Sequence, residues 1–274
     1  MTTVSVGDAE LFYEEAGSGP SLVLVHGSWA DHSGWAAVVP LLAATYRVVT
    51  YDRRGHSQSS QPPGQGSINE DVEDLAGLIR LLNLQPALVA GNSFGALITL
   101  RLAGAHPDLL RGLAVHEPPG LGLLAGDAEY APMLQGFGER AAAVATLLEQ
   151  EQNAEAAELF VETIALGPGS WTQLPAEQQA TFIRNAQTFF DEMREPDALD
   201  LDLQQLHTYA GPVLLTQGDQ SPPMFAPVLD RIQAVLPQSE RQTYLGAGHV
   251  PHMTHPEDYA NTLTGYAVAA EGQR

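Results

Sequence analysis

The chain has 274 residues, of which 44% are apolar and 16% are charged, and this composition is typical of a folded protein with a sizeable core. Twelve basic and 33 acidic side chains give a formal net charge of −21, which argues against nucleic acid and anionic membrane surfaces as partners. The sequence has no cysteine, and all of its basic residues are arginines. Thiol catalysis, cysteine-ligated metals and Schiff-base lysines are therefore excluded.

No apolar run approaches the ~18 residues that span a membrane. The first four residues have neither the basic stretch nor the apolar run of a signal peptide. We therefore expect a cytoplasmic protein without membrane association. The sequence leaves open whether the chain forms a homo-oligomer.

Short apolar runs alternate with amphipathic stretches, and this alternation predicts an α/β fold. The expected strands lie at residues 4–6, 11–14, 22–25, 47–51, 87–90, 110–115, 213–216 and 242–245, with the first two antiparallel to each other. The expected helices lie at residues 34–44, 68–82, 95–105, 228–236 and 256–269. The helix at 68–82 follows a capping box, in which Ser67 and Glu70 satisfy free N–H groups of the first turn.

The strand signals stop between residues 120 and 207. Stretches rich in Ala, Glu and Gln predict only helices there, with breaks at Gly167-Pro168-Gly169 and at Glu195-Pro196. We therefore predict a core domain made of residues 1–119 and 208–274, interrupted by a helical insertion, residues 120–207, which we call the cap.

The segment Gly91-Asn92-Ser93-Phe94-Gly95 has the pattern G-x-S-x-G and stands between an expected strand and an expected helix. In that setting the serine lies on a tight turn, and glycine two residues to either side lets the neighbouring chain approach. The N-terminus of the helix directs free N–H groups at any oxyanion formed there. We predict that Ser93 is a nucleophile.

An oxyanion hole of this type takes a second N–H donor from the loop after the first long strand. That loop begins His26-Gly27-Ser28-Trp29. We expect the backbone N–H groups of Ser28 and Phe94 to form the hole, where one donor typically contributes about 10²–10³ in rate.

His249 stands in the glycine-flanked segment Gly246-Ala247-Gly248-His249, directly after the last expected strand. Because this loop opens at the same edge of the sheet as the nucleophile, we predict that His249 is the general base. His252 and His255 follow at a spacing that could suggest a metal site, but two prolines break the helix that would align the three imidazoles. We expect no metal and no other cofactor.

Four segments, taken in chain order, resemble the motifs of the α/β-hydrolase superfamily: Val25-His26-Gly27, Asp52-Arg53-Arg54-Gly55-His56-Ser57, Gly91-Asn92-Ser93-Phe94-Gly95 and Gly248-His249. The resemblance covers almost the whole chain outside the cap. It implies a mostly parallel, eight-stranded sheet flanked by helices, a helical cap after the sixth strand, and a triad in the chain order Ser, acid, His.

The position of the acid departs from the usual pattern. Most members carry it after the penultimate strand, where this chain has Ser221, and a neutral hydroxyl cannot stabilise an imidazolium. Asp219 is the nearest carboxylate, but it comes two residues early. Glu117 follows the sixth strand, where haloalkane dehalogenases and zearalenone-type lactone hydrolases carry a Glu. The lactone hydrolases also resemble this chain in the run Thr254-His255-Pro256-Glu257. The resemblance implies Glu117 as the acid, with Asp219 as the alternative.

The predicted reaction is acyl transfer to Ser93, followed by hydrolysis of the acyl-enzyme. We expect the substrate to be a neutral, moderately hydrophobic small-molecule ester or lactone, with a large aromatic lactone as the first candidate. Aromatic residues at the seam between cap and core are the candidates for binding it: Trp29, Trp171 and Phe189.

Two other interpretations stay open. The serine segment also resembles that of meta-cleavage-product C–C hydrolases, which act on anionic dienoates and would need a cation in the cap, for which Arg184 is the candidate. A binding protein with the hydrolase fold but idle catalysis is the second interpretation. The presence of Ser93, Glu117 and His249 argues against it.

Overall fold

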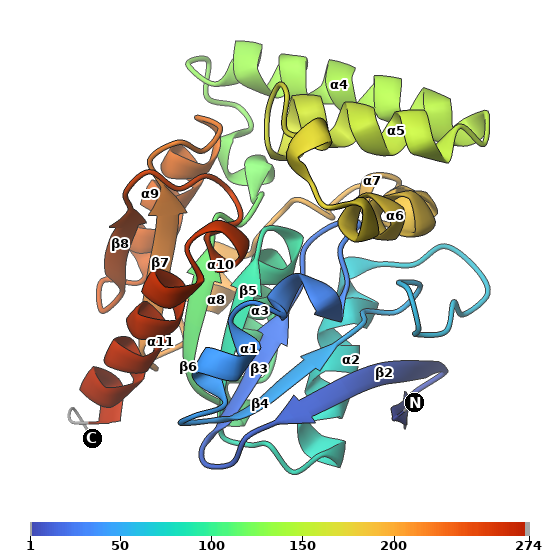
Figure 1. Ribbon diagram of the computed structural model, residues 1–274. Coiled ribbons are helices and arrows are strands. Elements are labelled where there is room, and N and C mark those ends of the chain that lie inside the picture. The colour runs from blue at the N-terminus through green and yellow to red at the C-terminus, as the bar shows by residue number, and fades with distance from the viewer. Residues whose placement is uncertain (1, 272–274) are drawn as a thin grey trace.

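An eight-stranded sheet forms the centre of the computed structural model, which describes residues 2–271. The strand order is β1-β2-β4-β3-β5-β6-β7-β8 (Figure 1). β2 pairs antiparallel with both β1 and β4, and every other pairing is parallel. The strands are Thr3–Val6 (β1), Ala9–Ala16 (β2), Ser21–Val25 (β3), Arg47–Tyr51 (β4), Ala87–Asn92 (β5), Leu110–His116 (β6), Val213–Gly218 (β7) and Glu240–Tyr244 (β8). This sheet confirms the predicted fold class.

Helices cover both faces of the sheet, and alternate strand residues point to each face. Val23 and Val25 pack with one group of helices, whereas Leu22 and Leu24 pack with the other. The first group comprises α2 (Ile68–Leu81), α3 (Phe94–Ala105), α8 (Leu203–Leu206) and α9 (Phe225–Val235). The second comprises α1 (Val39–Leu42) and α11 (Pro256–Glu271), with the short α10 (Pro251–Thr254) contacting α11. The central strands therefore lie between two apolar layers and read as continuous apolar runs.

The helix predicted at residues 34–44 is wrong as a single element. The chain forms a 3-10 helix, His32–Trp35, and then the separate helix α1. Asp31 caps the 3-10 helix by accepting from the backbone N–H of Ser33. Pro40 lies at the start of α1, where its missing N–H is tolerated, although it could not continue a longer helix. Half of the predicted capping box is present: the Ser67 side chain accepts from the N–H of Glu70, whereas Oε1 of Glu70 accepts from Arg54.

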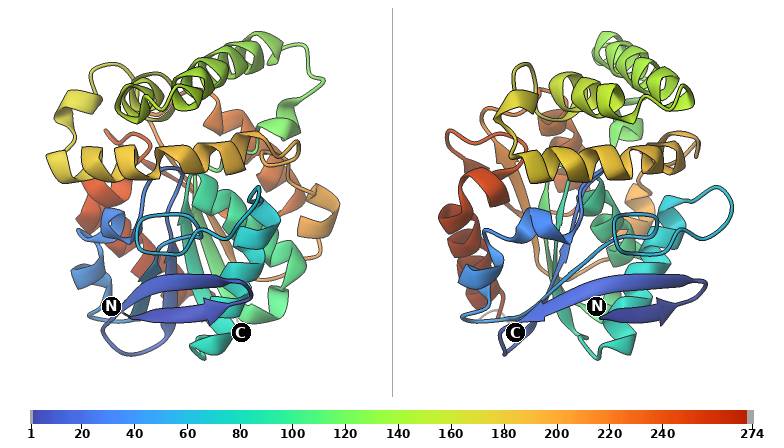
Figure 2. Two further views of the ribbon diagram at one scale, coloured as in Figure 1. Left: turned by 90° about the vertical axis from the view of Figure 1, so that its right-hand side faces the viewer. Right: turned by 45° about the vertical axis from the view of Figure 1, so that its right-hand side comes forward.

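In the described chain only helices and loops lie between β6 and β7. They include α4 (Ala131–Glu149), α5 (Asn153–Phe160), a π-helical turn (Val161–Ala165), α6 (Ala176–Asn185) and α7 (Phe189–Met193), with 3-10 turns at Leu121–Leu124, Trp171–Gln173 and Ala186–Thr188. A further 3-10 turn, Pro107–Leu109, precedes β6. Figures 1 and 2 show α4 to α7 over one edge of the sheet, with α6 and α7 nearest to it.

The cap has an apolar core of its own, which includes Val144, Leu148 and Phe160. The two ends of the insertion do not belong to this cluster, because Leu121 and Leu206 pack in the apolar core against the sheet. The division at residues 120 and 207 stays a prediction. No helix among the described residues is both long and apolar enough to cross a membrane.

The turn between β5 and α3 brings three chain segments into close contact. Ser93 lies at the apex of this turn with φ 55° and ψ −123°, a backbone conformation that residues other than glycine rarely adopt. A Cβ atom on Gly91 would lie 2.4 Å from the carbonyl oxygen of Gly95, and one on Gly95 would lie 2.3 Å from that of Val25. Only glycine fits at both positions, so the spacing of the motif follows from the packing of backbone against backbone.

We predict that Gly95→Ala lowers the free energy of unfolding by about 3 kcal/mol, because its new methyl group meets backbone that cannot rotate away. Gly138→Ala is the matched control. Gly138 lies in exposed α4 with open space around it, so alanine should stabilise by about 0.5–1 kcal/mol. Urea denaturation of both variants measures the difference. Equal stability of Gly95→Ala and the parent chain would contradict this account of the turn.

Candidate active site

Ser93 and His249 line the same cavity between core and cap. His249 follows β8, and its backbone carbonyl accepts a hydrogen bond of 2.9 Å from the Asn92 side chain, next to Ser93 in sequence. The Phe225 ring stacks on the imidazole, with ring centroids 4.4 Å apart. The loop that carries the imidazole is thus fixed to the turn that carries the hydroxyl.

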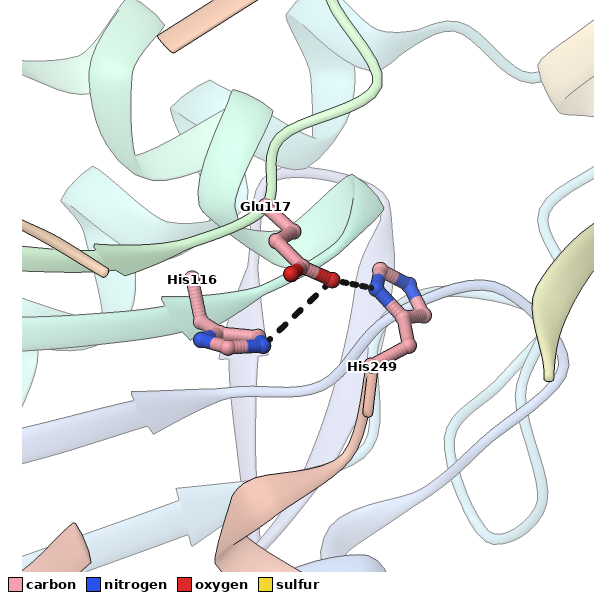
Figure 3. A group of neighbouring side chains, drawn as sticks. All are labelled: His116, Glu117 and His249. Carbon is pink, nitrogen blue, oxygen red and sulfur yellow. Dashed lines mark hydrogen bonds and ion pairs between the residues drawn. The ribbon is translucent and has the colours of Figure 1, made fainter. Parts of the chain in front are cut away.

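Glu117 holds the other side of the imidazole. Its Oε2 accepts from His249 Nδ1 at 2.6 Å, and its Oε1 accepts from the backbone N–H of Gly218 at 2.7 Å (Figure 3). Burial alone would raise the pKa of the Glu117 carboxyl, but the hydrogen bond from His249 and the nearby ring of His116 outweigh burial and hold this pKa well below its usual range. A carboxylate only accepts, so Nδ1 of His249 carries the proton and Nε2 is left as the base.

His116 is a second imidazole beside the same carboxylate. Its Nε2 lies 3.5 Å from Glu117 Oε2, and its Nδ1 lies 3.0 Å from the Thr216 hydroxyl (Figure 3). Burial lowers the pKa of His116, so the ring is neutral near pH 7. His116, Glu117 and His249 are close enough to suggest metal ligands. However, ligand atoms about 2.0–2.1 Å from a tetrahedral zinc would lie further apart than the 2.6 Å between Glu117 and His249, which is a hydrogen-bond distance.

Asp31, His32 and Asp52 form a similar group near the cavity. Its central contact, between His32 Nδ1 and Asp52 Oδ1, is again a hydrogen bond of 2.6 Å. The absence of a metal stays a prediction for this chain.

The structure brings Glu117, and not Asp219, to His249. Asp219 is exposed, and its Oδ1 accepts from the backbone N–H of Gly246 at 2.8 Å, so it holds the turn after β8. The hydroxyl of Ser221, at the usual position of the acid, is buried without a hydrogen-bond partner among the described residues.

The two predicted oxyanion donors lie on either side of Ser93. Phe94 is the first residue of α3, where a backbone N–H has no partner within the helix. Ser28 lines the cavity in the loop after β3, and a Cβ on the preceding Gly27 would lie 3.0 Å from the Ser93 Cβ. Neither N–H donates to another group in the described part of the chain.

The cavity has two lobes that share Ser28, Ser93 and His249. The outer lobe adjoins a wide mouth lined by exposed residues such as Ala37 and Gln173. The deep lobe is lined chiefly by apolar residues, and the buried ones include Phe160, Phe189, Met224 and Phe225.

Of the three predicted substrate-binding residues, only Phe189 lines either lobe. Trp29 is fully buried and stacks on Phe160 at 4.6 Å between ring centroids, so it belongs to the core of the cap. Trp171 packs against the same cluster. Large aromatic side chains at this seam therefore serve mainly to dock the cap on the sheet domain.

Comparison with known proteins decides the family. Residues 20–256 match the family described as alpha/beta hydrolase fold. The chain belongs to the α/β-hydrolase fold family. Proteins similar to it are named for reactions at different bonds.

Among curated relatives, this α/β hydrolase is 40% identical over 128 residues to the uncharacterized hydrolase YraK of Bacillus subtilis, an alignment that covers 46% of this chain and 47% of that protein. It is 26% identical over 272 residues to the 2-(acetamidomethylene)succinate hydrolase of Mesorhizobium japonicum, which covers 97% of this chain and 94% of that protein. The chain thus spans 47% of YraK, and it spans only 41% and 35% of two further curated proteins that it matches.

Among solved structures, an α/β hydrolase from Sphaerobacter thermophilus superposes with a TM-score of 0.79 at 24% identity, covering 97% of this chain and 99% of that one. Similar folds include an N-acyl homoserine lactone degrading enzyme, a thermophilic esterase and a putative ancestral haloalkane dehalogenase. At such low identity these likenesses show the fold alone.

The sequence analysis did not identify three buried polar residues near the site as functional candidates: His26, Arg53 and Glu192. Within the α/β-hydrolase motifs, His26 donates from Nδ1 to the carbonyl of Gly27 at 2.9 Å, and its Nε2 accepts from the backbone N–H of Arg53 at 3.0 Å. Burial and the charge of Arg53 lower the pKa of His26 to about 4, so it is neutral near pH 7. Glu192 of the cap lines the deep lobe. The His-Gly and Asp-Arg-Arg-Gly motifs signal the first two residues, whereas no local pattern marks Glu192.

We predict that Glu117→Gln lowers kcat for p-nitrophenyl butyrate by roughly 10⁴-fold, because a neutral amide cannot stabilise the imidazolium of His249. Asp219→Asn is the control and should change kcat by less than about threefold, since its contacts are to a surface turn. Steady-state kinetics on both variants test the assignment. A collapse in Asp219→Asn with Glu117→Gln nearly unaffected would reverse it.

Proposed function

We propose that the protein is a serine hydrolase that cleaves a neutral, moderately hydrophobic carboxylic ester or lactone through an acyl-enzyme on Ser93. The observation that carries this proposal is the 2.6 Å hydrogen bond from His249 to Glu117 beside the cavity that Ser93 lines. This bond leaves Nε2 of the imidazole as a base for the serine proton.

In the proposed reaction, the Ser93 oxygen forms a bond to the carbonyl carbon of the substrate while His249 Nε2 takes the serine proton. The oxyanion is stabilised by the backbone N–H groups of Ser28 and Phe94. The tetrahedral intermediate then expels the alcohol, which receives that proton from His249. Water, deprotonated by His249, then attacks the acyl-enzyme, and His249 returns this proton to the Ser93 oxygen as its bond to the acyl carbon breaks and the acid is released.

The lining of the cavity favours an uncharged substrate. Among the described residues that line the two lobes there is no arginine, and the chain has no lysine. Asp31 lines the outer lobe, and Glu192, which pairs with Arg53, lines the deep lobe. A substrate carboxylate in either lobe would lie near one of these acids with no lining cation to bind it, at a cost in a buried site.

The two lobes suggest how an ester binds. The alcohol must leave before water can reach the acyl-enzyme, so it belongs in the outer lobe, next to the mouth. The acyl group, held by its bond to Ser93, belongs in the deep lobe. In this proposal the cap, residues 120–207, selects the substrate through residues such as Ile164 and Phe189, which line that lobe.

A large aromatic lactone is the first substrate to test. The placement of Glu117 after the sixth strand, as in zearalenone-type lactone hydrolases, supports this choice, and the chain also resembles in fold a lactone-degrading enzyme. The C–C hydrolase alternative is less well supported. Arg184, its candidate cation, is exposed on α6 and lines neither lobe.

We predict that a fluorophosphonate probe labels the native protein and that Ser93→Ala abolishes both labelling and ester turnover, by at least about 10⁴-fold in kcat. Ser33→Ala, in another serine that lines the outer lobe, should keep both. Mass spectrometry of the labelled protein locates the adduct. A native protein that is neither labelled nor active on esters and lactones would instead support the binding-protein alternative, and turnover of a dienoate alone would support the C–C hydrolase.

We predict that Ile164→Trp, which fills the deep lobe, lowers kcat/KM for p-nitrophenyl octanoate by at least about tenfold while p-nitrophenyl acetate is hydrolysed as before. Leu166→Trp, two residues further along, fills the outer lobe and the mouth instead. In Leu166→Trp, kcat/KM should fall as the alcohol group becomes larger and should not depend on the length of the acyl chain. In Ile164→Trp, each methylene contact that the acyl chain loses is worth roughly 1 kcal/mol, so the loss in kcat/KM should grow with the length of the acyl chain. The reverse pattern would mean that the acyl group lies in the outer lobe.

A further inference from the structure

A buried arginine joins the core to the cap beside the candidate oxyanion hole. Arg53 follows β4 and is 2% exposed. Its Nε and Nη2 donate to the two carboxylate oxygens of Asp71 on α2, at 3.1 and 2.9 Å. Its Nη1 and Nη2 donate to Oε1 of Glu192 on α7, at 3.1 and 3.2 Å. One guanidinium therefore binds a carboxylate from each of the two parts of the molecule.

The same group of charges lies beside both residues that carry the proposed oxyanion donors. The Arg53 guanidinium lies 4.8 Å from the centroid of the Phe94 ring. Glu192 and Ser28 line the deep lobe together. Arg53 Nη1 also makes a long contact of 3.5 Å with the carbonyl oxygen of Gly27.

The Gly27 contact matters because that carbonyl and the N–H of Ser28 belong to one planar peptide group. A group that fixes the oxygen also fixes the direction of the N–H at the other end. His26 Nδ1 makes the shorter bond to this oxygen, at 2.9 Å, and the backbone of Arg53 holds His26. Arg53 thus supports the peptide both through its own side chain and through the imidazole.

We infer that Glu192 and Arg53 are positioning residues, through which the docked cap holds the oxyanion hole in its productive geometry. This inference rests on the proposed acyl-transfer function. Donors in such a hole must be held to within about 0.5 Å, and side chains locked by their own hydrogen bonds provide that precision. Glu192 is the cap's contribution, since it binds the guanidinium and lines the deep lobe beside Ser28.

Other acids of the cap allow a matched comparison. Asp191, the neighbour of Glu192, accepts from the backbone N–H of Gly66 at 2.9 Å, and Glu195 accepts from that of Ile68 at 2.7 Å. Both contacts join cap and core, yet their partners lie in the loop before α2 and at its first turn, away from Ser28 and Phe94. A purely structural role for Glu192 would make it equivalent to Asp191.

The test compares Glu192→Gln with Asp191→Asn, using p-nitrophenyl butyrate and a trifluoromethyl ketone, whose adduct with a serine places an oxyanion in the hole. We expect Glu192→Gln to lower kcat by roughly 10- to 100-fold, to weaken inhibition by the ketone by a similar factor, and to leave KM within about threefold. Asp191→Asn should change neither kcat nor inhibition by more than about threefold. Unchanged kcat and inhibition in a folded Glu192→Gln variant would overturn the inference.

Glu192→Asp serves if Glu192→Gln does not fold. It keeps the buried negative charge but shortens the side chain by one methylene and so withdraws the carboxylate from Arg53, and it should reduce kcat and ketone affinity together, by roughly three- to tenfold. A folded Glu192→Asp variant with both quantities unchanged would contradict the inference. Fluorophosphonate labelling of the native protein distinguishes failure of this inference from failure of the proposed function. If the native protein is labelled and the variants have the kcat and ketone affinity of the native protein, only the inference is wrong. If the native protein is not labelled, the proposed function is wrong as well.

Discussion

The hydrogen bond between Glu117 and His249 joins residues 132 positions apart and fixes the geometry of the site. It depends on the backbone of Glu117, whose φ of 49° turns the side chain back along the end of β6, and on Gly218, whose N–H holds the second carboxylate oxygen. Glu117 is completely buried, so its charge would be costly without these partners. The position of the His249 loop is therefore tied to the stability of the core as well as to the proposed chemistry.

Parallel strand order explains why the candidate groups meet. β3, β5 and β6 lie side by side and end at one edge of the sheet, so Ser28, Ser93 and Glu117 emerge there from three successive loops. Ligand sites in open parallel sheets lie at this carboxyl edge for the same reason. Backbone hydrogen bonds link the loops to one another, since the N–H of Ser93 donates to the carbonyl of His116. Small shifts in one loop are consequently transmitted to its neighbours.

The cap closes this edge with apolar surface and a few buried charges. The deep lobe is lined mainly by aromatic and aliphatic side chains. Such a lining excludes water, and hydrogen bonds to an oxyanion are stronger where water is excluded. In a chain of net charge −21, Arg53 lies fully buried between two carboxylates, beside the loop that carries Ser28. The cap thus combines two roles in our proposals, the selection of an uncharged acyl group and the support of the oxyanion hole.

Local patterns in the sequence were sufficient for the fold class, the eight strands and the glycine spacing around Ser93, because alternation, capping and backbone crowding act over a few residues. They failed for the helix at residues 34–44, which breaks before Pro40, and they did not show that Trp29 is buried against Phe160 of the cap. Only the tertiary structure shows that Glu117, and not Asp219, hydrogen-bonds to His249. Both follow neighbouring strands, and the choice depends on where each side chain finds its hydrogen-bond partners. The pairing of Arg53 with Glu192 across 139 residues likewise leaves no local signal, because two buried charges select each other only after the cap has docked.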